Sequence, residues 1–135
     1  MNVDLLLSYI PYFETVDPGV VCKWGGGEKR EDGVFTIPYA IYDEKLYDFI
    51  KDAHDSGVMV SDYSNELNRL VPDWKTVDIQ EVVKTSDFYK LRVIFTKCIR
   101  VDRFNEGALG GSVQDGLVLA MLKRMQELKA NENQE

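Results

Sequence analysis

The stretch "KCIRVDRFNEGALGG", residues 97–111, joins the two segments of the chain with the clearest helical patterns. Before it, apolar side chains recur every three or four positions through residues 86–104, which predicts a helix. After it, residues 112–130 show the same spacing, and Ser112 is a favourable residue for capping a helix start. The glycines between them can end one helix and turn the chain into the next. The sequence therefore predicts an antiparallel helix pair at the end of the chain.

The segments upstream of this pair combine helical patterns with two extended runs. Apolar periodicity and capping residues predict helices at residues 2–10, 43–57, 61–71 and 78–84, with Pro11 ending the first and Asp43 capping the second. Residues 20–24 and 34–42 are rich in strand-forming residues, which favours a β-hairpin with a long loop. The predicted fold class is α+β and mainly helical, with five or six helices, one β-hairpin and a final antiparallel helix pair.

Length and composition are typical of one folded domain. The chain has 135 residues, of which 44% are hydrophobic and 29% charged. We expect one globular domain over residues 1–130 and a disordered polar tail over residues 131–135. No apolar run has the length of a membrane span, and no signal peptide is recognised. Two distant cysteines without such a signal favour reduced thiols and a cytoplasmic location.

The net charge of -7 argues against general nucleic-acid binding. The charge is uneven, because residues 1–83 carry 7 basic and 16 acidic side chains, whereas residues 84–130 carry 9 basic and 5 acidic ones. Two oppositely charged halves that pack on each other explain this pattern, and we favour that interpretation. The alternative is that the basic half binds an anionic partner.

The sequence lacks the residue patterns of several common catalytic and metal-binding sites. His54 is the only histidine, and Cys22 and Cys98 show no paired spacing, so a zinc site is not expected. No nucleophile elbow, phosphate-binding loop or calcium-binding loop is present. We therefore expect no catalytic residue, no metal site and no cofactor. An enzyme is the less favoured interpretation of the sequence.

Asp102 is the charged residue in the most unexpected position. If residues 86–104 form one helix, Asp102 lies at the centre of its apolar side, while Arg92, Arg100 and Arg103 lie beside that side. A carboxylate in such surroundings is costly unless it is paired. The sequence therefore predicts a structural ion pair between Asp102 and Arg92, Arg103 or Arg124.

The same region supplies a candidate binding site. Arg100, Arg103 and Glu106 could line a small pocket for an anion or a peptide, although helix-end ion pairs explain the same residues without a ligand. Trp24 and Trp74 are aromatic residues with polar groups and could form part of a partner-binding surface, with core packing as the alternative.

The motif "RVDRFNEG", residues 100–107, followed by a glycine-led apolar helix, resembles a family of small bacterial proteins of unknown function. The segments "YIPYFE" and "PYAIYDEKLYDFI" add to the resemblance, which covers nearly the whole chain. It implies a compact, helix-rich bacterial domain, and it transfers no catalytic residue.

Three functions remain open from the sequence. A noncatalytic binding or regulatory module is favoured, with a protein partner as one option and no membrane association. The second is a small-anion-binding protein or enzyme that uses Arg100 and Arg103. The third is an acidic inhibitor that mimics nucleic acid through residues 43–81. The sequence sets neither the oligomeric state nor the identity of a partner.

Overall fold

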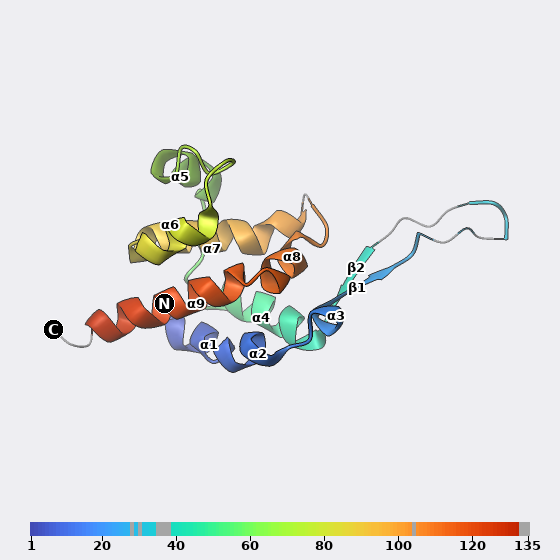
Figure 1. The fold of residues 1–135 in the computed structure, drawn as a ribbon, viewed down its shortest axis with the longest axis horizontal. Helices are drawn as coiled ribbons and strands as arrows, with labels where there is room; N and C mark the ends of the chain where they lie inside the picture. The colour runs from blue at the N-terminus through green and yellow to red at the C-terminus, as the bar shows by residue number, and fades with distance from the viewer. Residues whose placement is uncertain (28, 30, 35–38, 104, 133–135) are drawn as a thin grey trace.

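The chain folds into a mainly helical α+β structure with a two-stranded hairpin at one end (Figure 1). The computed structural model describes residues 1–27, 29, 31–34, 39–103 and 105–132, with only the backbone of Arg103 and Glu132. The elements in order are α1 (Val3–Leu7), α2 (Ile10–Thr15), α3 (Pro18–Val21), β1 (Cys22–Gly25), β2 (Tyr39–Tyr42), α4 (Glu44–Asp55), α5 (Tyr63–Leu70), α6 (Ile79–Thr85), α7 (Phe88–Arg100), a 3-10 turn η1 (Val101–Arg103), α8 (Ala108–Gln114) and α9 (Leu117–Glu132). The predicted fold class is confirmed, although the described residues form more helices than expected.

Helices α7 and α9 form the centre of the helical body. α9 contacts α1, α2, α6, α7 and α8, so it connects the N-terminal helices to the rest. Phe49 of α4 is fully buried and packs edge-on against Phe95 of α7, with ring centroids 6.0 Å apart. Tyr9 and Phe13 contact the same Phe49 ring, at 5.1 and 4.9 Å. This aromatic cluster joins three helices that are far apart in the sequence.

The N-terminal segment departs from the prediction at Pro11. Asn2 caps α1, because its Oδ1 accepts a hydrogen bond from the Leu5 amide. Pro11, however, lies in the first turn of α2, where a missing N–H costs nothing, rather than ending a helix. Asp43 precedes α4, but its side chain makes no cap and instead accepts a hydrogen bond from the Tyr12 hydroxyl at 2.6 Å.

The prediction of one helix over residues 112–130 is wrong. Ser112 lies inside α8, and Gly116 separates α8 from α9 with a left-handed φ of 88°. Asp115 restarts the helix, since its Oδ1 accepts from the Leu117 amide at 3.0 Å. A short helix is therefore inserted between the two predicted partners, α7 and α9. α9 also includes residues 131 and 132 of the expected tail, and residues 133–135 lie outside the described residues.

The hairpin is antiparallel, with Cys22 opposite Tyr42 and Gly25 opposite Tyr39. Figure 1 shows it at the end of the molecule opposite the C-terminus. The first strand begins later than predicted because residues 20 and 21 belong to α3. The second predicted strand includes residues 35–38, which lie outside the described residues. Among the helices of the described residues, none has the length and apolar character required to span a membrane.

Candidate functional site

The turn before α8 anchors the hairpin to the helical body. Glu106 Oε1 accepts a hydrogen bond from the Ala40 amide at 2.9 Å, so the carboxylate binds the outer edge of β2. Gly110 lies so close to the hairpin that an added Cβ would be 2.9 Å from Cys22 Cβ and 2.9 Å from Tyr42 Cε1. Glu106, which the sequence placed in a possible ligand pocket, therefore has an internal structural partner.

Asp102 connects the same turn to the hairpin. Its Oδ1 accepts a hydrogen bond from the Leu109 amide at 2.9 Å, and the Tyr42 hydroxyl donates to its carboxylate. The Tyr42 oxygen in turn accepts from the Gly110 amide at 3.2 Å. Burial, followed by the hydrogen bond to Asp102, raises the pKa of Tyr42 above its ordinary value. Asp102 thus accepts the Leu109 amide at the start of α8, and the Tyr42 oxygen accepts the next amide, that of Gly110.

Two of the three predicted arginine partners of Asp102 bind elsewhere, and the side chain of the third, Arg103, lies outside the described residues. Arg92 donates to the carbonyl oxygens of Val58 and Gly57. Arg124 donates twice to the Ser86 carbonyl and forms an ion pair with Glu127 at 3.1 Å. An ion pair of Asp102 with Arg92 or Arg124 is therefore replaced by hydrogen bonds to an amide and a hydroxyl. The sequence pattern singled out Asp102, which is half-buried, but it did not identify the groups that bind its carboxylate.

Arg100 is the arginine that this region leaves without an acidic partner. Its guanidinium lies 5.9 Å from the centroid of the Tyr63 ring, and its buried Nε has no hydrogen-bond partner. No ion pair joins it to another described residue. The side chain of Arg103 lies outside the described residues. Of the two arginines proposed as an anion clamp, Arg100 therefore remains available.

Two adjoining cavities of about 410 and 250 Å³ lie between α5, the segment that follows it, α7 and α8. They share the lining residues Leu67, Trp74, Lys97 and Val101, and we call them together the Trp74 groove. Trp74 is half-buried and its Nε1 donates to Asn68 Oδ1 at 2.7 Å, which fixes the indole orientation. Tyr63, the residue beneath Arg100, lines the smaller cavity.

The charged residues that line the Trp74 groove are both lysines. Lys97 Nζ is 4.6 Å from the centroid of the Trp74 ring, and Lys75 Nζ is 5.5 Å from it. Neither lysine forms an ion pair with a described residue, and no Asp or Glu is among the described residues that line the groove. Since the whole chain has a net charge of -7, this groove differs in sign from the surface average. It suits an anionic ligand.

Cys98 is the candidate nucleophile among the described residues that line the groove. Cys98 lines its larger cavity, and burial raises the pKa of this thiol to about 11, so the nucleophilic thiolate is scarce at neutral pH. His54 is exposed on α4 and does not line the groove. Within the part of the chain that the structure describes, no group of three His, Cys, Asp or Glu residues could hold a metal ion. The arrangement can bind and orient a molecule.

Sequence reasoning selected Trp74 and Arg100 and missed the lysines between them. Lys97 and Arg100 are three residues apart in α7, so they share one face of that helix, a signal that the sequence contains. Lys75 follows Trp74 directly, and nothing in its spacing indicates that it folds back over the indole ring. Trp24 lies apart from the groove on the hairpin, where its ring packs against Gly107 while 60% of the residue stays exposed.

Comparison with known proteins yields one match. No curated protein and no solved structure matches the chain. One family model does match, over residues 1–131, which include the hairpin, the turn that anchors it and the Trp74 groove. The chain therefore belongs to the family of unknown function DUF6508.

Proposed function

We propose that the protein is a noncatalytic binding module whose Trp74 groove takes a small organic anion with a flat apolar body. The observation that carries the proposal is that Lys75 and Lys97 lie against Trp74 without an ion pair, in a groove whose described lining has no acid. An anionic group that lies near both ammonium groups replaces lost hydration with charge-assisted hydrogen bonds.

The apolar part of the ligand lies against Trp74, Leu67 and Val101. The two cavities together fall within the usual size of small-molecule sites, which are mostly apolar with a few polar groups. Arg100 is a second cation on the same face of α7 as Lys97. It lies over Tyr63, which lines the smaller cavity, but is not itself among the described lining residues. A carboxylate or sulfonate in the groove therefore lies near the ammonium groups of Lys75 and Lys97.

The test uses naphthoate as the probe and the fluorescence of Trp74 as the signal. The chain has two tryptophans, so Trp24→Phe leaves Trp74 as the only indole fluorophore. In this background naphthoate is expected to change the Trp74 emission in a saturable way. Lys97→Gln should weaken binding roughly tenfold, since a charge-assisted hydrogen bond is lost. Arg100→Gln should weaken it less, because Lys75 and Lys97 remain.

Lys51→Gln is the matched control, because Lys51 is an exposed lysine on α4 that does not line the groove. It removes the same charge from the chain and should leave the affinity unchanged. Naphthamide, the neutral analogue, tests the role of charge directly. Equal affinity for naphthoate and naphthamide, or equal losses in Lys97→Gln and Lys51→Gln, would refute the proposal.

A further inference from the structure

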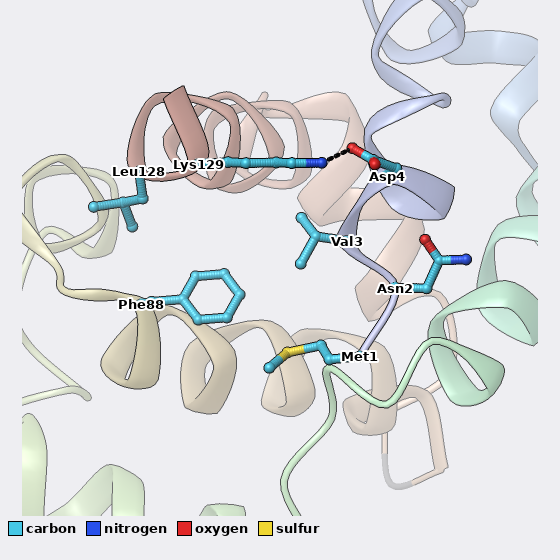
Figure 2. Close-up of a pocket in the computed structure, with 7 residues that line it drawn as sticks. All are labelled: Met1, Asn2, Val3, Asp4, Phe88, Leu128 and Lys129. Carbon is cyan, nitrogen blue, oxygen red and sulfur yellow. Dashed lines mark hydrogen bonds and ion pairs between the residues drawn. The ribbon is translucent and has the colours of Figure 1, made fainter. Parts of the chain in front are cut away.

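A second cavity lies at the other end of the helical body from the hairpin. It has a volume of about 550 Å³ and is formed by the N-terminal segment with α1, the start of α7 and the last turns of α9. Figure 2 shows Met1, Val3, Phe88 and Leu128 around it. We call it the N-terminal pocket. Its size is in the range of small-molecule sites, and its described walls are mainly apolar.

An ion pair crosses the edge of the N-terminal pocket. Lys129 of α9 donates a hydrogen bond to Asp4 of α1, and Figure 2 shows the lysine stem extending across the pocket to reach it. The methylene groups of Lys129 thus add apolar surface to the wall. The Asp4 side chain is 71% exposed and that of Lys129 is 38% exposed, so water or a ligand can reach both charged groups.

The ion pair restricts the head group of a ligand that enters this pocket. A carboxylate attracted to Lys129 meets the negative charge of Asp4, and an ammonium attracted to Asp4 meets the positive charge of Lys129. A charged head group therefore gains one attraction and meets one repulsion of similar size. A neutral hydroxyl or amide has both a donor and an acceptor, so it can donate to Asp4 and accept from Lys129 while their contact stays intact.

We infer that the N-terminal pocket binds a neutral amphiphile, a short apolar chain or ring that carries a hydroxyl or primary amide. The apolar body is buried against Val3, Phe88 and Leu128, and the head group bridges Asp4 and Lys129. This preference is opposite to that of the Trp74 groove, which selects an anion. The two sites share no lining residue, so each can be present without the other.

The experiment compares three probes that differ only in their head group: hexanol, hexanoate and hexylammonium. Binding is measured by the methyl chemical shifts of Met1, Val3 and Leu128, with any purification tag at the C-terminus. Hexanol is expected to bind more tightly than either charged probe by roughly tenfold, since each charged head group is repelled by one member of the pair and loses more hydration on entering the pocket. A charged probe that binds as tightly as hexanol, or no binding by any of the three, overturns the inference.

Variants locate the site and test the role of the ion pair. Leu128→Trp fills the pocket and should abolish hexanol binding, whereas Gln126→Trp adds the same side chain at an exposed position of α9 that does not line the pocket and should leave it unchanged. Asp4→Asn removes the negative charge and should raise the affinity for hexanoate relative to wild type. If Leu128→Trp is poorly folded, the Asp4→Asn variant still tests the inference. An unchanged hexanoate affinity in Asp4→Asn contradicts the role of Asp4 and Lys129 in binding the head group.

Discussion

Gly110 is a position at which α8 packs closely against the hairpin. Cys22 and Tyr42 occupy the space that a side chain at Gly110 would need, whereas nothing lies within 4 Å of the equivalent point at its neighbour Gly111. Both glycines are in α8, and neither has a left-handed backbone. The two positions therefore differ in packing, not in backbone conformation, and they form a matched pair for mutation.

Gly110→Ala is expected to destabilise the protein by about 1 to 3 kcal/mol, because the added methyl group overpacks the contact with β1 and β2. Gly111→Ala should instead stabilise it by about 0.5 to 1 kcal/mol, since alanine loses less entropy in a helix. Urea unfolding of the two variants beside wild type measures both effects. Equal free energies of unfolding for the two variants would show that the close approach at Gly110 has no energetic consequence.

At the scale of elements, the hairpin depends on contacts with the turn that precedes α8. Asp102 and Glu106 lie on either side of the undescribed residue 104, and each carboxylate binds a backbone amide of another element. A two-stranded hairpin has marginal stability by itself. Glu106, which the sequence placed in a possible ligand pocket, therefore acts with Asp102 in fixing β2 to α8.

Glu106→Ala should loosen β2 without unfolding the helices. The Ala40 amide loses its acceptor, so its hydrogen exchange is expected to accelerate about fivefold, which corresponds to the loss of about 1 kcal/mol for one hydrogen bond. Glu106→Gln keeps a side-chain oxygen and should retain part of the protection. The amides of α7 are the internal control and should exchange as in wild type. Unchanged exchange at Ala40 in Glu106→Ala would contradict this role of the carboxylate.

At the scale of the whole molecule, three tyrosine hydroxyls and one cysteine thiol have higher pKa values in the folded protein than in the unfolded chain. Burial is the first cause for each, and it raises the pKa values of Tyr9, Tyr12 and Tyr42 above the ordinary 10.0 and that of Cys98 from 9.0 to about 11. The tyrosines also donate hydrogen bonds to nearby aspartates, which favours their protonated form. These groups are distributed across α2, β2, α7 and the segment between α1 and α2.

The protein is therefore expected to lose stability at alkaline pH. Above about pH 9, Cys98 loses its proton in the unfolded chain but keeps it in the folded protein. Above about pH 10, the same holds for the tyrosines. The unfolded state then binds fewer protons than the native state, so the free energy of unfolding falls as pH rises. Urea unfolding from pH 7 to pH 11 measures this, with a constant midpoint expected below about pH 9.

Tyr12→Phe isolates one of these groups. The variant loses the hydrogen bond to Asp43 and is less stable at neutral pH, but its stability should fall less steeply above about pH 10 than that of wild type. A wild-type midpoint that stays constant up to about pH 11 would contradict the assigned shifts.

The sequence by itself determined the helices whose signals are local. The apolar spacing of α4, α5 and α7 and the caps at Asn2 and Asp78 involve residues within a few positions of each other, so the neighbouring chain is sufficient to specify them. The presence of a hairpin was predictable for the same reason. The mainly helical α+β fold class follows from these patterns.

Only the tertiary structure decided which groups satisfy Asp102 and how the Trp74 groove is assembled. Asp102 meets the hydroxyl of Tyr42, and Lys97 meets the indole of Trp74, through packing between segments that the sequence does not place side by side. Periodicity marks a buried acid or an amphipathic face, but it does not indicate which distant element covers it. Which element covers it depends on close packing of the whole core. Gly110 has no side chain and so leaves room for Cys22 and Tyr42 of the hairpin, and Gly116 separates α8 from α9.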